Sequence, residues 1–266
     1  MLRFLILALS AFFLTVPSFA DAGSSAAGNP ILPAAEVAAF SDDVQQDLAA
    51  RGAKVAIVAR TGRDPRTLPA GVNYTHVSYW VYSQITKPDG TTGRGYRVYN
   101  LYQEQGNLTR SALVQDSPAD FFAGAHKLDA GIIIPDARLQ EKLLGVIASN
   151  TYRSLHNPNY AVLANPATTQ FQNCTEHTLD VLFASLYGTN DQAQIKANIA
   201  AYFQPQVIEI DGVKRLFAPV ASQALTTTDH GATIGTATFG SIARFMEANE
   251  LSREVYRMTP GQLSRF

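Results

Sequence analysis

The order of apolar and polar residues along the chain follows two different repeats, one typical of helices and one typical of strands. Residues 34–51 carry apolar side chains at helical spacing, and this pattern stops at Gly52. Residues 53–59 alternate as a strand does, and a loop with two prolines is expected over 60–73. The chain therefore begins with a helix followed by a strand.

A β-hairpin is the clearest element of the middle of the chain. Residues 74–82 and 96–103 are dense in Val, Tyr and Trp, and the Gly-rich segment 83–95 between them predicts a long loop. The pattern then predicts a strand at 108–114, a helix at 118–123 capped by Ser117, a strand at 131–134, a helix from 136, a loop at 149–172, helices at 174–187 and 193–202, strands at 206–210 and 214–218, and a helix near 239–248. Strands and helices are segregated, which indicates an α+β fold with an antiparallel β-sheet packed against helices.

The composition narrows the class of protein. The chain has 266 residues, of which 46% are hydrophobic and 16% charged, with 21 basic and 22 acidic side chains. This balance excludes an intrinsically disordered chain, and 18 glycines and 13 prolines without a period exclude a collagen-like one. Near-neutral charge excludes the basic surface that binds phosphate groups, so no nucleic acid partner is expected.

The N-terminus has the pattern of a secretory signal peptide. A short positive start precedes an uncharged apolar run over 4–16, and small residues follow, which predicts cleavage after Ala20 or Ala22. That run is shorter than the ~18–20 apolar residues of a membrane span, and no later stretch approaches this length. We therefore expect a periplasmic or secreted protein with no transmembrane segment in the mature chain.

No repeat and no linker divides the rest of the chain. Small residues over 21–33 predict a flexible leader. Residues 34–266 are expected to form a single α+β domain, with residues 189–266 as a C-terminal extension of unassigned role.

Cys174 is the only cysteine, so it is either a buried small hydrophobic residue or a functional thiol. It begins the helix 174–187 directly after Asn173, the expected N-cap. A helix N-terminus favours a thiolate over a thiol and offers backbone N–H groups to an oxyanion. This position predicts a thiol nucleophile.

A thiol nucleophile needs a base, and five histidines are available. His177 lies one turn after Cys174, but two ligands on one helix make a poor metal site, and no metal or other cofactor is expected. His230, which follows Asp229, is a secondary candidate. His76 is favoured because it opens a strand, a rigid platform on which another group can hold the imidazole in one tautomer.

The motifs around these residues resemble a known superfamily. The segments THVSYW at His76, VYNLYQ at Asn100 and NCTEH at Cys174 occur in the order His, polar residue, Cys. This order resembles the circularly permuted papain-like superfamily, which includes NlpC-like hydrolases and lecithin retinol acyltransferase-like proteins, over about 76–187. The whole chain is most similar to an uncharacterised family of secreted bacterial proteins with the same FQNCTE segment.

The resemblance implies a permuted papain-like core in which Cys174 is the nucleophile and His76 the general base. Asn100 holds the place of the third residue, which orients the imidazole, and Gln103 is the competing assignment. The thiol would attack an amide, ester or thioester carbonyl. The Cys174 backbone N–H would then hold the oxyanion, with these residues as further candidate donors: Gln172 and Asn173.

Two functions remain open at this point. The first is a periplasmic or secreted cysteine hydrolase or acyltransferase that acts on a small molecule, a peptide such as cell-wall peptide, or a lipid. The second is a non-catalytic periplasmic binding or assembly protein on the same fold. Its contact surface would consist of the hairpin aromatics Tyr79, Trp80, Tyr82, Tyr96, Tyr99 and Tyr102. A fast-reacting Cys174 favours the enzyme, and an inert, buried Cys174 favours the binding protein.

Overall fold

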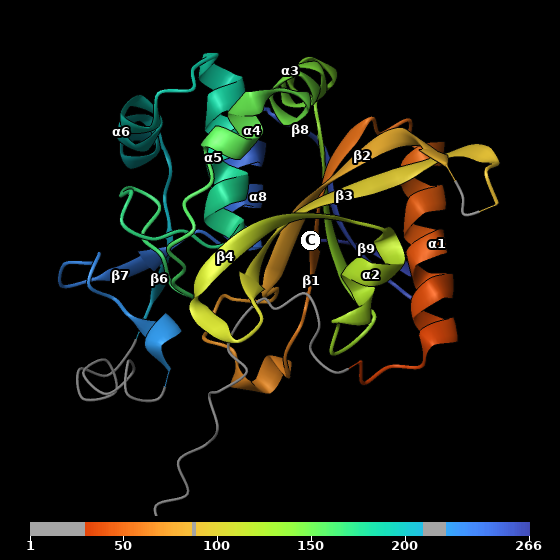
Figure 1. Ribbon diagram of the computed structural model, residues 1–266, viewed down its shortest axis with the longest axis horizontal. Helices are drawn as coiled ribbons and strands as arrows, with labels where there is room; N and C mark the ends of the chain where they lie inside the picture. The colour runs from red at the N-terminus through yellow and green to blue at the C-terminus, as the bar shows by residue number, and fades with distance from the viewer. Residues whose placement is uncertain (1–29, 87–88, 210–221) are drawn as a thin grey trace, which may run out of the picture.

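The computed structural model describes residues 30–86, 89–209 and 222–266 (Figure 1). The expected signal peptide, residues 21–29 of the expected leader and the strand expected at 214–218 lie outside these residues. Within the described residues, no helix combines the length and the apolar character needed to cross a membrane.

An antiparallel sheet of seven strands forms the centre of the molecule. Its strands are β1 (Val55–Arg60), β2 (His76–Thr86), β3 (Thr92–Glu104), β4 (Asn107–Asp116), β5 (Ala130–Pro135), β8 (Ser252–Thr259) and β9 (Gln262–Arg265). Their spatial order is β4-β3-β2-β1-β5-β8-β9, and each neighbouring pair is antiparallel. Helices pack against this sheet, so the α+β prediction is confirmed.

The central strands contribute to two hydrophobic layers, because successive residues of a strand point to opposite faces of the sheet. Ile57 of β1 and Tyr79 of β2 belong to one layer, and Val58 and Trp80 belong to the other. None of these four side chains is more than 1% exposed. Burial on both faces explains why β1 reads as an almost continuous apolar run.

Two helices cover the layer of Trp80, which we call the α1 face. They are α1 (Ala34–Ala50) and α2 (Pro118–Ala123), which lie to the right of the sheet in Figure 1. α2 begins with the predicted N-cap, Ser117, whose hydroxyl accepts the backbone N–H of Asp120. The hydrophobic side chains that the two helices bury are Val37, Phe40, Val44, Leu48, Phe121 and Phe122.

The layer of Tyr79, which we call the α5 face, lies under the other helices. They are α3 (Ala137–Ala148), α4 (Asn150–Ser154), α5 (Cys174–Tyr187), α6 (Gln192–Tyr202) and α8 (Phe239–Ala248). α5 begins after its predicted cap Asn173 and ends at Gly188, whose φ of 64° suits glycine. A small sheet and two 3₁₀ turns complete the described fold: β6 (Gln206–Ile208), β7 (Ile234–Thr236), η1 (Pro65–Thr67) and η2 (Gln223–Leu225).

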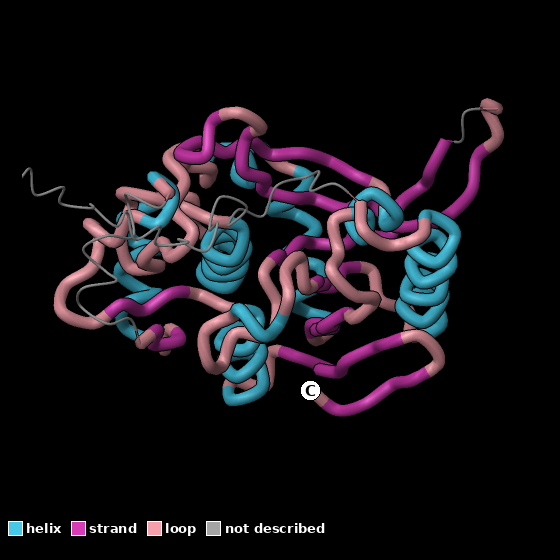
Figure 2. The backbone as a smooth tube through the Cα atoms, turned by 90° about the horizontal axis from the view of Figure 1, so that it is seen from below, coloured by secondary structure: helices cyan, strands magenta, loops and turns pink. Residues whose placement is uncertain are grey.

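The β2–β3 hairpin is longer, and its loop shorter, than the sequence pattern predicted. β2 continues to Thr86 and β3 begins at Thr92, so Gly93 and Gly95 belong to the ladder rather than to the loop. Figure 2 shows the tip of this hairpin projecting beyond the neighbouring helices. Glycines and threonines resemble loop sequence locally, and only pairing with the partner strand makes them part of the sheet.

The C-terminal segment is part of the main sheet, which the sequence pattern did not predict. β8 pairs with β5, and β9 pairs with β8 at the sheet edge. In β8 only Tyr256 is buried, and β9 is exposed throughout, so neither strand has a strong apolar alternation. The segment 149–172 was expected to be a loop, but it contains the short helix α4.

Candidate functional site

Cys174 lies where the first turn of α5 meets the start of β2. Its Sγ is 4.0 Å from the carbonyl oxygen of Thr75, the residue before His76. The side chain is 4% exposed. It packs in a small apolar cluster with Leu101, Tyr160 and Ala224. Because Ala224 belongs to η2, the segment after residue 189 helps to cover the thiol.

His76 opens β2, and its side chain is fully buried on the α1 face. The imidazole stacks on the ring of Tyr102, with centroids 4.7 Å apart and an interplanar angle of 14°. The ring of Phe121 lies 5.4 Å away. Nε2 of His76 is 3.0 Å from Oδ1 of Asn100. His76 and Asn100, which sequence reasoning paired, are therefore hydrogen-bonded.

The environment of His76 keeps its ring neutral. Burial lowers the pKa of His76 well below its ordinary value of 6.5, the charge of Arg60 lowers it further, and the bond to Asn100 opposes this shift. Arg60 is the cross-strand partner of His76 on β1. A neutral imidazole is the form that can accept a proton.

Asn100 connects His76 to a carboxylate at the end of β4. Nδ2 of Asn100 donates to Oδ2 of Asp116 at 3.1 Å, and the hydroxyl of Tyr102 donates to the same oxygen at 2.7 Å. Burial raises the pKa of Asp116, although the bond from Tyr102 lowers it. Sequence reasoning missed Asp116, because only the β3–β4 pairing brings this strand-terminal carboxylate beside Asn100.

Cys174 touches the backbone next to His76 without bonding to the imidazole. Nδ1 of His76 has no hydrogen-bond partner among the described residues, and Nε2 is bonded to Asn100. The alternation of β2 explains this arrangement, since His76 points to the α1 face while α5 covers the opposite face. The two groups are brought to the same end of the sheet but not into a hydrogen-bonded pair.

Arg60 is a second residue of this region that sequence reasoning missed. The pattern placed it in the loop 60–73, but it ends β1 and is only 2% exposed. Its guanidinium donates to the carbonyl oxygen of Gly124. Glycine is needed at position 124, because an added Cβ there would lie only 2.7 Å from Nη2 of Arg60. Burial lowers the pKa of Arg60, and its electrostatic interactions with Tyr102, Cys174 and Asp116 oppose that shift. The sequence signal was an arginine directly after an alternating apolar run.

The two expected oxyanion donors have structural partners. The amide nitrogen of Gln172 donates to the carbonyl of Leu155 and to Oδ2 of Asp180, both at 2.9 Å. Asn173 caps α5 with its amide oxygen, and its amide nitrogen donates to the carbonyl of Val162 at 2.9 Å. Both side chains fix the loop that precedes Cys174.

Gln103, the competitor of Asn100, lies on the other face of β3, where its amide nitrogen donates to the carbonyl of Leu108. Its Oε1 has no hydrogen-bond partner in the described part of the chain. Since Asn100 bonds to His76 and Gln103 bonds to the β3–β4 turn, Asn100 is the better candidate for the orienting role.

Asp229 and His230, the secondary candidates, join two loops. Oδ2 of Asp229 accepts the backbone N–H of Asn165 at 2.7 Å, and Nε2 of His230 donates to the carbonyl of Leu163 at 2.6 Å. These bonds fix the chain after η2 against the segment that precedes α5. Their contacts with residues 163–165 give them a role in holding the cover over Cys174.

His177 has a structural partner of its own. Its Nε2 donates to the carbonyl of Tyr152 at 3.1 Å, and burial lowers the pKa of the imidazole to about 3. In the described ranges, no group of three or more His, Cys, Asp or Glu side chains is placed to hold a metal ion.

A buried ion cluster anchors the beginning of α5 to α6. Nζ of Lys196 lies 2.6 Å from Oε1 of Glu176 and 2.7 Å from Oδ1 of Asp180. These three side chains are 9%, 1% and 4% exposed. Burial raises the pKa of both carboxyl groups, and the charge of Lys196 lowers it. The cluster therefore holds the helix that carries Cys174 in place.

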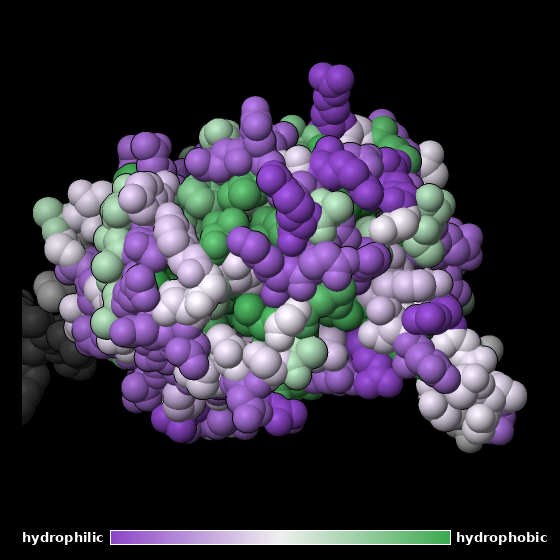
Figure 3. Space-filling model, turned by 90° about the horizontal axis from the view of Figure 1, so that it is seen from above, coloured by the Kyte–Doolittle hydropathy of each residue, from purple (hydrophilic) through white to green (hydrophobic). Residues whose placement is uncertain are grey.

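An apolar hollow lies at the opposite end of α5 from Cys174. Figure 3 looks onto this end of the molecule, where hydrophobic side chains are surrounded by hydrophilic ones. The cavity there has a volume of about 400 Å³ and is lined by residues of α3 and the end of α5, including Val146, Leu186 and Tyr187. A helix of this length spans about 20 Å, so this hollow is not the approach to the thiol.

Comparison with known proteins gives one match. The profile of a family described as "Uncharacterized protein conserved in bacteria (DUF2145)" matches residues 47–246. This range includes the whole candidate site, from Arg60 to Cys174. No curated protein and no solved structure matches the chain.

Proposed function

The chain belongs to the DUF2145 family, and we propose that it is a cysteine hydrolase or acyltransferase with Cys174 as nucleophile and His76 as general base. Asn100 orients the imidazole. The proposal includes a permuted papain-like core, with the His at a strand start, the polar residue on the next strand and the Cys at a helix start. It also includes export to the periplasm or medium after cleavage of the N-terminal signal. Mass spectrometry of the exported chain tests the cleavage after Ala20 or Ala22.

The hydrogen bond between Nε2 of His76 and Oδ1 of Asn100 carries the proposal. An amide oxygen only accepts, so Nε2 holds the proton and Nδ1 keeps its lone pair. Nδ1 has no hydrogen-bond partner among the described residues. Burial lowers the pKa of His76 well below 6.5, so the ring is neutral before the reaction begins. A neutral imidazole fixed in one tautomer with a vacant nitrogen has the properties of a general base.

The reaction requires that the Cys174 thiol leave the Thr75 carbonyl and reach Nδ1 of His76, which faces the other side of the sheet. The thiol proton moves to Nδ1, the sulfur bonds to the carbonyl carbon, and the carbonyl electron pair becomes an oxyanion. That charge develops at the N-terminus of α5, whose dipole stabilises it. The oxyanion electron pair then re-forms the carbonyl, the bond from the carbonyl carbon to the leaving group breaks, and Nδ1 gives its proton to the departing amine, alcohol or thiol. Water or another acceptor releases the acyl group from Cys174.

The substrate class follows from the resemblance to papain-like hydrolases and from the proposed compartment. An amide, ester or thioester of a cell-wall peptide or a lipid fits a thiol nucleophile that works outside the cytoplasm. Acyl transfer and hydrolysis differ only in the acceptor, so both remain within the proposal.

A non-catalytic binding or assembly protein is the second candidate, and the burial of the site favours it. Cys174 is 4% exposed, and His76 is not exposed at all. The aromatic contact surface that a binding protein was expected to have, however, is largely absent. Of the six hairpin aromatics, Tyr79, Trp80, Tyr96 and Tyr102 are buried in the core, Tyr99 packs on Tyr152, and Tyr82 is 38% exposed.

Alkylation of the native protein by iodoacetamide tests the proposed function, because Cys174 is the only thiol. We expect labelling of the wild type at neutral pH and none of Cys174→Ala. The His76→Gln variant should react about 10²-fold more slowly at pH 7, since a positioned base contributes at least this much. His126→Gln is the matched control, because this half-buried histidine lies in a loop outside the proposed site.

An activity readout completes the test. Incubation with p-nitrophenyl acetate should give an acyl adduct on Cys174, detected by mass spectrometry, and His76→Gln should form it more slowly. Alkylation only after unfolding would support the binding protein. Equal rates of Cys174 alkylation in the wild type and His76→Gln across the pH range would show that His76 is not the base.

A further inference from the structure

The amide of Asn100 lies between two groups that impose different requirements on it. On one side Oδ1 is 3.0 Å from Nε2 of His76, and on the other Nδ2 is 3.1 Å from Oδ2 of Asp116. An amide presents an acceptor at one end and a donor at the other. Its orientation therefore decides which of the two groups receives the donor.

An ionised carboxylate at Asp116 allows only one orientation of the Asn100 amide, because a carboxylate only accepts hydrogen bonds. Nδ2 of Asn100 must then face Asp116, and Oδ1 must face His76. An oxygen opposite Nε2 requires that Nε2 carry the proton. The negative charge at Asp116 thus determines, through one amide, that Nδ1 of His76 is the unprotonated nitrogen.

Asp116 is held in place for this role from several directions. The hydroxyl of Tyr102 donates to the same Oδ2 at 2.7 Å, and the Tyr102 ring stacks on His76. Burial and the nearby carboxylate of Asp120 raise the pKa of Asp116, whereas the hydroxyl of Tyr102 and the charge of Arg60 oppose this shift and favour the ionised form. The three side chains come from β1, β3 and α2 and surround the end of β4.

We infer that Asp116 is a positioning residue, which fixes the orientation of the Asn100 amide and thereby the Nε2–H tautomer of His76. This inference rests on the proposed function for its catalytic meaning, but not for its structural content. If the amide turned by half a revolution, Nδ2 would face Nε2, the imidazole proton would move to Nδ1, and His76 could no longer accept the thiol proton.

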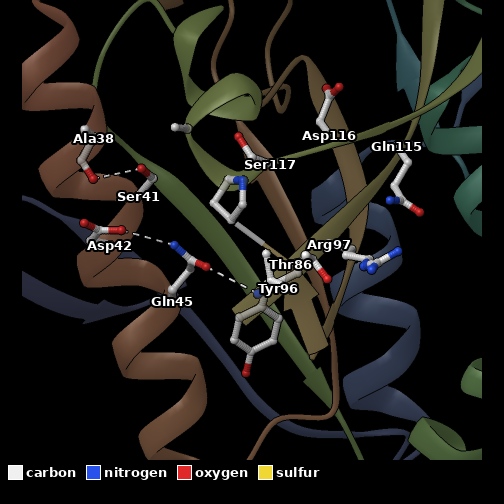
Figure 4. Close-up of a pocket in the computed structure, with 13 residues that line it drawn as sticks. Ala38, Ser41, Asp42, Gln45, Thr86, Tyr96, Arg97, Gln115, Asp116 and Ser117 are labelled. Carbon is white, nitrogen blue, oxygen red and sulfur yellow. Dashed lines mark hydrogen bonds between the residues drawn. The ribbon is translucent and has the colours of Figure 1, made fainter. Parts of the chain in front are cut away.

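The surroundings of Asp116 make it a suitable site for substitution. It lines a cavity of about 480 Å³ between α1, the end of β2, the first half of β3 and the end of β4. Figure 4 shows Asp42 on α1 and Asp116 at the end of β4, on different sides of this cavity. Asp42 bonds to Gln45 and not to Asn100. Asp42→Asn therefore makes the same change of charge in the same cavity without touching the amide.

The test is the tautomer of His76, observed by long-range ¹H–¹⁵N correlation NMR of the ¹⁵N-labelled protein at pH 7.5. The His76 signals are assigned by their loss in His76→Gln. In the wild type we expect the Nε2–H form alone. In Asp116→Asn the new amide accepts or donates equally well, so the Nδ1–H form should rise to about half of the molecules. Asp42→Asn should match the wild type.

Tyr102→Phe tests whether the tautomer of His76 depends on the carboxylate of Asp116 or changes with any disturbance of the site. This variant loses the second donor to Asp116 but keeps the carboxylate that faces Nδ2, so the Nε2–H form should persist. Iodoacetamide alkylation of Cys174 should fall about two-fold in Asp116→Asn, in proportion to the lost tautomer. An unchanged tautomer in Asp116→Asn, or an equal change in Tyr102→Phe, would overturn the inference.

The two readouts distinguish this inference from the proposed function. A shifted tautomer with an unchanged alkylation rate would confirm the role of Asp116 in orienting Asn100 and would show that His76 is not the base. If the tautomer is unchanged in Asp116→Asn but the alkylation rate of Cys174 still depends on His76, the proposed function stands and Asp116 has no part in it.

Discussion

Replacement of Lys196 by Met should destabilise the fold through the helix that carries Cys174. Lys196 is the only cation bonded to Glu176 and Asp180 among the described residues, at 2.6 and 2.7 Å. Met retains most of the aliphatic volume, so the main change is the loss of the ammonium group. Removal of one partner from a buried ion pair usually costs about 3–5 kcal/mol, because the remaining charge is buried without compensation.

The proton binding of Asp180 sets the size of the destabilisation in Lys196→Met. Without Lys196, Asp180 can stay buried only if it binds a proton. At pH 7 this costs about 4 kcal/mol, since pH 7 lies about 3 units above the ordinary pKa of Asp and each unit corresponds to about 1.4 kcal/mol. At pH 5 the same step costs about 1.5 kcal/mol.

The sign of the pH dependence follows from the direction of the shift. In the variant the folded carboxyl has a raised pKa, so the destabilisation grows as the pH rises above the unfolded value of about 4 and disappears as the pH falls towards it. Urea unfolding, followed by the fluorescence of the single, fully buried Trp80, measures the difference from the wild type at pH 7 and pH 5. The deficit should shrink by about 2–3 kcal/mol on acidification.

Two controls define the result that would refute this reasoning. Lys54→Met removes an exposed ion pair with Glu141, whose partners are 62% and 61% exposed, and should change stability by less than about 1 kcal/mol. Adding Glu176→Gln and Asp180→Asn to Lys196→Met should recover most of the loss. An equal deficit at both pH values would show that buried charge is not the cause.

Two further predictions concern the core. Burial lowers the pKa of His177 to about 3, so its stabilising contribution is complete above pH 6.5 and is lost as the pH falls, with a slope of up to about 1.4 kcal/mol per pH unit. Urea midpoints between pH 7 and pH 4 should fall less steeply in His177→Gln, and parallel curves would contradict this. In Gly131→Ala the new Cβ would lie 2.7 Å from ring carbons of both Phe239 and Tyr74, which should cost about 1–3 kcal/mol in urea unfolding. The control, Gly145→Ala, meets nothing within 4 Å on α3 and should be neutral or stabilising by up to about 1 kcal/mol.

Local chemistry explains which elements could be predicted. The caps Ser117 and Asn173 and the terminator Gly188 act on neighbouring backbone groups, so they mark helix ends wherever the chain goes. The apolar run of β1 likewise reflects burial on both faces of the sheet. Gly93 and Gly95 misled the prediction, since their place in β3 depends on a partner strand.

The edge strands show the limit of the apolar pattern. β9 is exposed at every residue, and β8 buries only Tyr256. Neither strand has the alternation that a half-buried strand shows. Their place in the sheet comes from backbone hydrogen bonds to β5 and to each other, which any sequence can form. The role of residues 189–266 in the main sheet was therefore not visible in the sequence.

The sequence alone determined which residues carry chemistry and where each lies along its own element. It placed the only thiol at a helix start, a histidine at a strand start and an asparagine on the next strand. The tertiary structure decided which of these residues meet. The β2–β3 pairing puts His76 and Asn100 on one face, and the β3–β4 pairing adds Asp116. It also turned His76 away from α5, because side-chain direction in a sheet depends on register, and register is set by partners far away in the chain.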